Sequence, residues 1–143
     1  MTKRNLYLAA PLFSVAERSF NVLLERQLSR HFQVFLPQRD NHLFVDLVAS
    51  GLSVDSARAK IFDGDMSAVR AAEVFLIVLD GRSVDEGASF ELGVAYTLEK
   101  TCVGLQTDPR RLLPLGNNPM VEGALSVIFR SVDDLIKWAA EHI

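Results

Sequence analysis

The chain has 143 residues, of which 49% are hydrophobic and 23% charged, and its formal net charge is -3. These values are typical of one globular domain, which we expect to span residues 1–143, and the small negative charge argues against a nucleic-acid polymer or an anionic membrane as partner. A single cysteine, Cys102, excludes an intrachain disulfide and a cysteine metal cluster. We find no signal-length or membrane-spanning apolar run, so a cytoplasmic location is expected.

The first half of the chain predicts strands and helices in alternation. A capping box formed by Ser14 and Glu17 indicates the start of a helix, because its side chains satisfy free backbone N–H groups there. The expected elements are a buried strand at 6–10, a helix beginning after Ser14, a strand at 32–37 stopped by Pro37, a loop with some helix at 38–52 and a helix at 53–72.

The second half repeats the alternation and contains the clearest strand, the apolar run "EVFLIVLDG" at 73–81. Ser83 and Glu86 form a second possible capping box at the start of the next helix. The remaining expected elements are a helix at 84–99, a strand at 101–108, a loop rich in Pro, Gly and Asn at 109–120, a strand at 126–130 and a closing helix.

Strand and helix therefore alternate about five times, and the strands read as continuous apolar runs. Strands of this kind are buried on both faces of a sheet. We predict an α/β fold: a doubly wound, flavodoxin-like sheet of about five parallel strands with helices on both faces. Ligands of such sheets bind beyond the carboxyl ends of the strands, which places Phe13 and Asp40 near an expected site.

Two carboxylates fall on apolar helix stripes that should face inward. Glu91 lies within the stripe of Ala88, Leu92 and Ala95, and Asp65 lies within a similar stripe on the preceding helix. A buried carboxylate is costly unless it is paired, and acid–base or nucleophilic chemistry is a common reason to keep one. The alternative is that each acid lies at the edge of its stripe and pairs with a neighbouring cation, Arg58, Lys60 or Arg82.

Other acids have simpler explanations. Asp85 and Glu86 lie in the first turn of a helix, where the helix dipole favours negative charge. Asp80 ends the central strand and either caps the following loop or is the phosphorylated aspartate of a signalling receiver domain. A receiver domain also needs an acidic pair after the first strand and a lysine after the last, and this chain has neither.

Common catalytic motifs are absent from the sequence. There is no GxGxxG after the first strand, no GxxxxGK[ST] and no GxSxG, which excludes the simplest dinucleotide, NTPase and serine-hydrolase sites. His31, His42 and His142 lack the spacing of metal ligands. Candidate chemistry is therefore limited to carboxylates, Tyr7 in the first strand and an amide pair at Asn117 and Asn118.

Four motifs in order give the chain a family likeness. They are "YLAAPLF" near the N-terminus, "DGDMSAV" before the central strand, "DEGASFELGVAY" after it and "NPMVEGAL" near the end. With these motifs the chain resembles the nucleoside 2-deoxyribosyltransferase family from the first strand to the last. It departs from members that place a C-terminal carboxylate or tyrosine in the site, because it ends in an ordinary helix, "KWAAEHI".

The resemblance implies a role for each matching residue. Glu91 matches the nucleophile that attacks the anomeric carbon of the deoxyribosyl group, and Asp65 matches the acid that manages the proton of the base. Tyr7 matches the phenol that orients the nucleophile, and Asp85 matches the carboxylate that holds sugar hydroxyls. Asn118 matches an amide lent to the neighbouring subunit's site. Phe13 and Asp40 are further candidate substrate contacts.

The resemblance implies transfer of 2-deoxyribose between nucleobases through a covalent intermediate on Glu91. Its substrates are a small deoxynucleoside and a free nucleobase, its assembly is a homo-oligomer, and no metal or organic cofactor is expected. The chemistry requires an ionised nucleophile and a protonated leaving-group acid, so the two environments must push the pKa values apart. Two alternatives stay open: a hydrolase of deoxynucleosides or their 5'-monophosphates, whose phosphate Ser14, Arg18 and Ser19 could bind, and a non-catalytic nucleotide-sensing domain.

Overall fold

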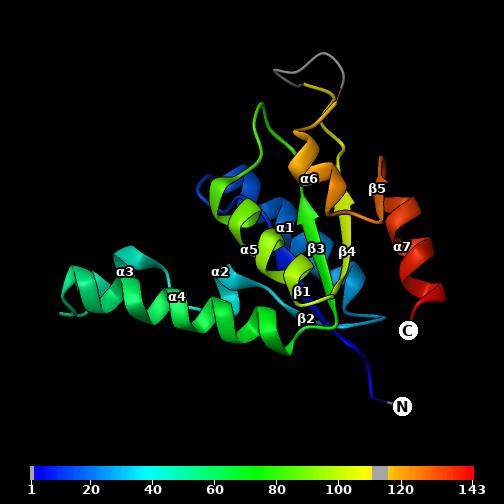
Figure 1. The fold of residues 1–143 in the computed structure, drawn as a ribbon. Coiled ribbons are helices and arrows are strands. Elements are labelled where there is room, and N and C mark those ends of the chain that lie inside the picture. Colours follow the sequence, from blue (N-terminus) through cyan, green and yellow to red (C-terminus); the bar gives the residue numbers. More distant parts are fainter. Residues whose placement is uncertain (1, 111–115) are drawn as a thin grey trace.

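A sheet of five parallel strands forms the centre of the computed structural model, which describes residues 2–110 and 116–143 (Figure 1). The spatial order of the strands is β2-β1-β3-β4-β5, and every neighbouring pair is parallel. This is the predicted flavodoxin-like order. The strands are β1 (Asn5–Ala9), β2 (Gln33–Phe35), β3 (Val74–Val78), β4 (Thr101–Leu105) and β5 (Val127–Phe129).

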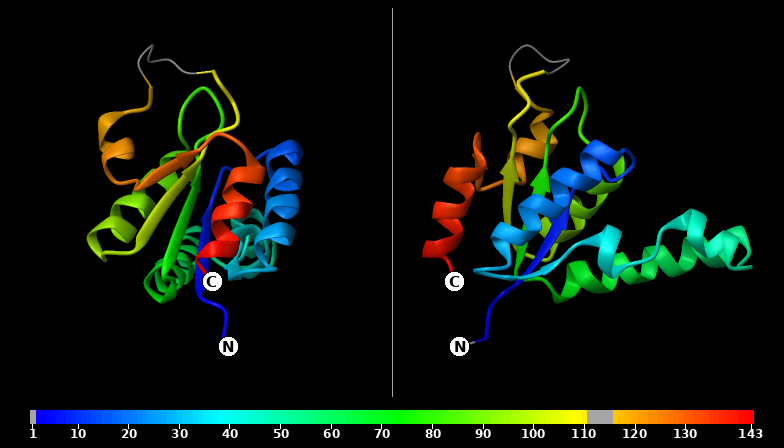
Figure 2. Two further views of the ribbon diagram at one scale, coloured as in Figure 1. Left: turned by 90° about the vertical axis from the view of Figure 1, so that its right-hand side faces the viewer. Right: turned by 180° about the vertical axis from the view of Figure 1, so that it is seen from behind.

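Helices cover both faces of the sheet, which confirms the predicted fold class. α1 and α7 pack on one face, and α4, α5 and α6 pack on the other (Figure 2). The helices are α1 (Val15–Leu28), α2 (Pro37–Asp40), α3 (Phe44–Ala49), α4 (Val54–Ala71), α5 (Glu86–Thr97), α6 (Pro119–Gly123) and α7 (Val132–Glu141).

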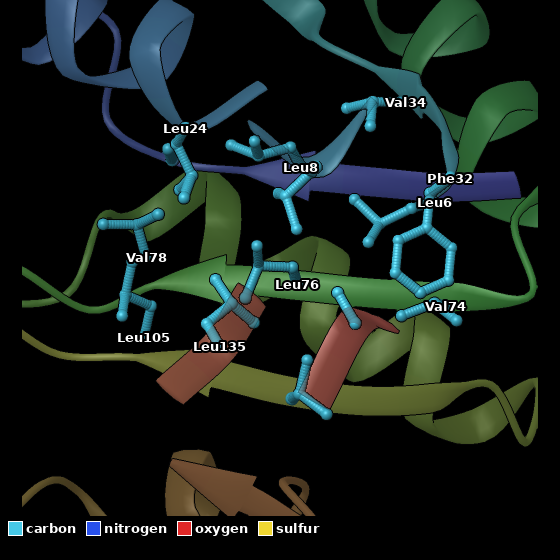
Figure 3. Close-up of a cluster of buried hydrophobic side chains, with 14 of the residues drawn as sticks. Leu6, Leu8, Leu24, Phe32, Val34, Val74, Leu76, Val78, Leu105 and Leu135 are labelled. Atoms are coloured by element: carbon cyan, nitrogen blue, oxygen red, sulfur yellow. The ribbon is translucent and has the colours of Figure 1, made fainter. Parts of the chain in front are cut away.

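Alternation along β1 divides its side chains between two hydrophobic cores. Leu6 and Leu8 join the core beneath α1 and α7, where Leu24 and Leu135 also lie (Figure 3). Tyr7 and Ala9 join the core beneath α4 and α5 because successive side chains of a strand point to opposite faces. This register directs Tyr7 toward the two helices that carry Asp65 and Glu91.

The segment that the sequence left largely unassigned, 38–52, contains helical structure. β2 ends at Phe35, two residues earlier than the predicted strand, and Pro37 instead begins α2, where its missing N–H costs no hydrogen bond. α3 follows and packs against α4. α3 and the N-terminal part of α4 extend together beyond the edge of the sheet (Figure 1).

The two predicted capping boxes have different outcomes. Ser14 and Glu17 form the expected reciprocal box at the start of α1. The box predicted for Ser83 and Glu86 is wrong: α5 begins later, and its N-cap is Asp85, whose Oδ2 accepts a hydrogen bond from the Ala88 N–H at 2.9 Å. Asp85 satisfies the same free backbone groups with its own carboxylate, so Ser83 is left outside the helix.

Part of the predicted loop at 109–120 lies outside the described residues. The described part contains the beginning of α6, which Asn118 caps by accepting a hydrogen bond from the Met120 N–H at 2.9 Å.

In 2–110 and 116–143, no helix has both the length and the apolar character needed to cross a membrane.

Candidate active site

A cavity of about 400 Å³ opens beyond the carboxyl end of β1. Its wall is built from the end of β1 and the loop after it, from residues 41–45, and from one side of α4 and of α5. Asp65, Asp85 and Glu91 all line this cavity. Three acids that are separated along the sequence therefore meet at the edge of the sheet where the fold class places ligands.

Glu91 lies in the second turn of α5, and its carboxylate has no ion-pair partner in the described part of the chain. Its Oε2 is buried and has no hydrogen-bond partner among those residues. Burial raises the pKa of Glu91 to about 8, and the negative charges of Asp65 and Asp85 contribute to the rise. An oxygen without a hydrogen bond keeps its lone pairs available for a reacting carbon.

The favoured protonation state of Glu91 differs from the ionised form that nucleophilic attack requires. A pKa of about 8 means that Glu91 is mainly the neutral acid near pH 7. The physical reason is that burial and two nearby acids disfavour another negative charge. A bound substrate that develops positive charge would reverse this preference, because it would supply the missing partner.

Tyr7 is fully buried and holds its hydroxyl close to Glu91 and Asp65. The ring stacks between Phe35 and Phe75, with centroid distances of 5.4 and 5.6 Å. Burial raises the pKa of the Tyr7 hydroxyl far above its usual range, and the charges of Glu91 and Asp65 raise it further. The hydroxyl makes no hydrogen bond of ordinary geometry to the described residues, so it is free to donate to either carboxylate.

Asp65 lies on α4 and receives one strong hydrogen bond. The side-chain amide of Asn41 donates from Nδ2 to Asp65 Oδ1 at 2.8 Å. Burial raises the pKa of Asp65, while the hydrogen bond from Asn41 and the nearby Tyr7 hydroxyl oppose that rise. The site therefore contains two acids, Asp65 and Glu91, that both favour the protonated form more than an exposed carboxyl group does.

Asp85 lies both at the start of α5 and in the wall of the cavity. Its Oδ2 caps α5, as the first-turn explanation of this acid predicts, and its side chain also lines the cavity. Gly87 lies beside it, where an added Cβ would approach Asp85 Oδ2 to 3.3 Å. A helix N-terminus holds negative charge favourably, so this end of the cavity is suited to a fixed carboxylate.

Of the two further predicted substrate contacts, Phe13 lies at the cavity and Asp40 does not. Phe13 lines the cavity with a side chain that is 77% exposed, at the rim. Asp40 lies outside the cavity lining: its Oδ2 accepts from the Leu36 N–H at 2.8 Å and pairs with Arg39 at 2.7 Å, so its carboxylate serves α2. Asp40 is therefore not retained as a substrate contact. The sequence placed Asp40 in a segment after the second strand, where the structure has the end of α2, but could not show which way its carboxylate points.

Asn118 also lies outside this cavity. It lines a separate hollow of about 530 Å³ between α5 and α6, together with Asn117 and Met120. The Asn117 Oδ1 is buried there without a hydrogen-bond partner in the described residues. Met120 is 83% exposed. Within one subunit, Asn118 therefore does not join the three acids.

The carboxylate of Asp80 caps a loop, as one of its two explanations predicts, but this loop follows β4 and not β3. Its Oδ1 accepts hydrogen bonds from the N–H groups of Thr107 at 2.6 Å and Asp108 at 2.9 Å. The carboxylate thus ties the end of β3 to the loop after β4.

In the described ranges, no group of three or more His, Cys, Asp and Glu side chains is arranged to hold a metal ion.

Two cavity residues had weak signals in the sequence. Asn41, the neighbour of Asp40, was not among the predicted site residues, and its hydrogen bond to Asp65 was missed. The sequence feature that could have indicated this bond is Gly64, which lies in the interior of α4, one residue before Asp65. A glycine inside a helix often marks a place where another group packs closely against the helix. Arg18, noted for a phosphate, lines the cavity from α1 and donates from Nη1 to the Leu12 carbonyl at 3.1 Å.

Solved structures with the same architecture come from several bacteria. A conserved protein from Enterococcus faecalis V583 is 24% identical, with a TM-score of 0.84 over 99% of this chain and 100% of that one. A 2-deoxyribosyltransferase from Bacillus psychrosaccharolyticus is 20% identical, with a TM-score of 0.76 over 92% and 90%. The CMP N-glycosidase BcmB from Clostridium botulinum is 16% identical, with a TM-score of 0.59 over 98% and 100%. At these identities the likeness shows a shared fold.

No match was found among curated proteins. The model of the nucleoside 2-deoxyribosyltransferase family matches residues 6–136, which is most of the chain and includes all the acids of the cavity. The chain therefore belongs to the nucleoside 2-deoxyribosyltransferase family.

Proposed function

We propose that the protein transfers 2-deoxyribose from one nucleobase to another through a covalent intermediate on Glu91. The observation that carries this proposal is the Glu91 carboxylate, which lines the cavity without an ion pair in the described residues, beside Tyr7 and Asp65. A structural acid of this depth is normally paired. An unpaired one at the ligand edge of the sheet is suited to bind a developing cation.

The first half of the reaction breaks the N-glycosidic bond. A Glu91 oxygen attacks the anomeric carbon and forms an ester bond to the sugar, while the electron pair of the broken C–N bond goes to the departing base. Asp65 gives that base a proton. Positive charge develops on the sugar as the bond breaks, and the adjacent carboxylate stabilises it, as in retaining glycosidases.

The second half reverses these steps with another base. Its nitrogen attacks the anomeric carbon, Glu91 leaves as a carboxylate, and Asp65 accepts the proton of the incoming base. Asp85 holds the sugar hydroxyls, and the Tyr7 hydroxyl donates to Glu91 when it is ionised. Phe13 offers an apolar surface at the rim, where a base could stack.

A complete site needs a second copy of the chain in this proposal. Asn118 lies beside the α5–α6 hollow and away from the cavity of its own subunit, so it would act on the site of a partner. The buried Asn117 Oδ1 and the exposed Met120 give the same region an unpaired acceptor and an apolar contact for that partner. These features support a homo-oligomer.

The test is incubation with deoxyinosine, with and without free adenine, and chromatography of the products. Deoxyadenosine formed only when adenine is present identifies a transferase, and hypoxanthine in both reactions identifies a hydrolase. Glu91→Ala is expected to lose at least about 10³-fold in rate, with Glu86→Ala on the exposed first turn of α5 as control. An unchanged rate in folded Glu91→Ala would contradict the assigned nucleophile.

A second candidate, an N-glycoside hydrolase of deoxynucleoside 5'-monophosphates, is favoured by Arg18. This guanidinium lines the cavity and pairs with no carboxylate in the described part of the chain, and guanidinium groups match phosphate well. The fold shared with a CMP N-glycosidase is consistent with it. Arg18→Gln should then lower kcat/KM for deoxycytidine monophosphate and leave that for deoxycytidine unchanged. Equal effects on both substrates would exclude phosphate recognition by Arg18.

A further inference from the structure

Asn41 uses both donors and the acceptor of its side chain to join two parts of the cavity wall. Its Nδ2 donates to Asp65 Oδ1 at 2.8 Å and to the Ile61 carbonyl at 3.0 Å. Its Oδ1 accepts from the His42 N–H at 2.8 Å. Its own N–H donates to the Pro37 carbonyl at 3.0 Å. The residue thus ties the end of α2 and the start of the 41–45 segment to α4.

Gly64 makes room for this arrangement. An added Cβ at this position would lie 2.9 Å from Asn41 Oδ1 and 3.0 Å from Asn41 Nδ2. Real Cβ atoms essentially never come within 3.0 Å of another heavy atom, so a side chain at position 64 would displace the Asn41 amide. The glycine thus lets the amide lie directly against the helix that carries Asp65.

We propose that Asn41 is a positioning residue that holds Asp65 Oδ1 as a hydrogen-bond acceptor and thereby controls the protonation of this acid, and that Gly64 is required for it to do so. An amide N–H that donates to Oδ1 occupies that oxygen as an acceptor, so the proton of the neutral acid resides on Oδ2. This inference rests on the proposed role of Asp65 in protonating the base. The effect of Asn41 on the titration of Asp65 can nevertheless be measured without any substrate.

Several other charged or titratable groups lie around Asp65 or line the same cavity, and they could affect the measured titration. Burial raises the pKa of Asp65, and the donated hydrogen bond from Asn41 opposes that rise because it stabilises the ionised form. Loss of the bond must therefore move the titration of Asp65 to higher pH. The surrounding groups are Tyr7 from β1, Arg18 from α1, His42 from the 41–45 segment, and Asp85 and Glu91 from α5.

The experiment follows the side-chain carboxyl ¹³C signal of Asp65 against pH in the full chain. Asp65→Asn assigns the signal by its disappearance. Asn41→Ala removes the amide, and Gly64→Ala displaces it while leaving the asparagine in place. Both variants are expected to titrate at higher pH than the unsubstituted protein. If the protein proves active, one limb of its pH–rate profile should be absent in Asp65→Asn. That limb should move to higher pH in Asn41→Ala and in Gly64→Ala.

Gly93→Ala is the matched control, because Gly93 is also a helical glycine but an added Cβ there meets nothing within 4 Å. It should leave the Asp65 titration unchanged. Circular dichroism establishes that each variant is folded, and if Asn41→Ala does not fold, Gly64→Ala alone decides. An unshifted Asp65 titration in a folded Gly64→Ala or Asn41→Ala protein overturns the inference. Absence of glycosyl transfer and hydrolysis with a shifted titration would instead reject the proposed function and leave the control by Asn41 standing.

Discussion

The Tyr7 hydroxyl lies close to the Glu91 carboxylate and opposes the rise that burial causes in the pKa of Glu91. The phenol is held in place by its stacked neighbours Phe35 and Phe75. A donor fixed in this way loses little freedom when it forms a hydrogen bond to an ionised carboxylate. Tyr7 therefore favours the charged form of Glu91, the form that the proposed attack requires.

The first prediction concerns the hydroxyl of Tyr7. The kcat/KM of the unsubstituted protein should rise with pH as Glu91 ionises, with a midpoint near its pKa of about 8. Tyr7→Phe should move this rising limb to higher pH, because the ionised form loses a donor. It should also lower the maximal kcat/KM about 10- to 100-fold, the value of one hydrogen bond to a charged group. Tyr96→Phe, on the exposed face of α5, is the control. An unmoved limb in Tyr7→Phe would contradict the assignment.

The second prediction concerns stability. The pKa of Glu91 is raised in the folded protein from 4.5 to about 8, so between these pH values the folded state binds a proton that the unfolded state has lost. The contribution of Glu91 to the free energy of unfolding must therefore fall as pH rises through this window. Glu91→Gln removes that contribution, so its advantage over the unsubstituted protein should grow from pH 5 to pH 8. Urea unfolding at both pH values measures it, with Glu86→Gln as control. A constant difference between the two proteins would count against a buried, unpaired carboxylate.

The third prediction separates the two roles of Asp85. Asp85→Asn keeps an N-cap acceptor for the Ala88 N–H but removes the charge from the cavity. We expect its thermal stability to stay close to that of the unsubstituted protein while KM for the deoxynucleoside rises. Asp85→Ala should lose the cap as well, at a cost of about 1 kcal/mol in the free energy of unfolding. If both variants retain the original KM, Asp85 serves the helix alone.

The fourth prediction tests whether Asn118 acts across a subunit interface. Asn118→Ser keeps a side-chain acceptor for the Met120 N–H but removes the amide, and this variant should be inactive when it is the only subunit present. A heterodimer of Asn118→Ser with Glu91→Ala, isolated with two different affinity tags, should recover about half of the original activity, since one of its two sites has both residues. If Asn118 acted within its own subunit, neither site would be intact and the heterodimer would be inactive.

Several elements followed directly from local patterns in the sequence. The capping box of Ser14 and Glu17 and the fully buried β3 were predictable because caps and continuous apolar runs are local properties. The start of α5 was misplaced because Ser83 and Asp85 are both good N-caps, and their competition is decided by the path of the chain after β3. Asp40 and Asn41 illustrate the same limit. They are adjacent in sequence, yet one carboxylate pairs with Arg39 and the other residue's amide enters the cavity wall.

The sequence by itself determined the alternation of strands and helices and the apolar stripes on which Glu91 and Asp65 fall, because helical and strand periodicity fix which side chains share a face. Only the tertiary structure decided that Glu91 lines the cavity without an ion pair to any described residue, that Tyr7 on β1 lies close to Glu91, and that Asn41 binds Asp65. These relationships join residues on different elements. Their distances depend on how helices pack on the sheet, and no local pattern records that packing.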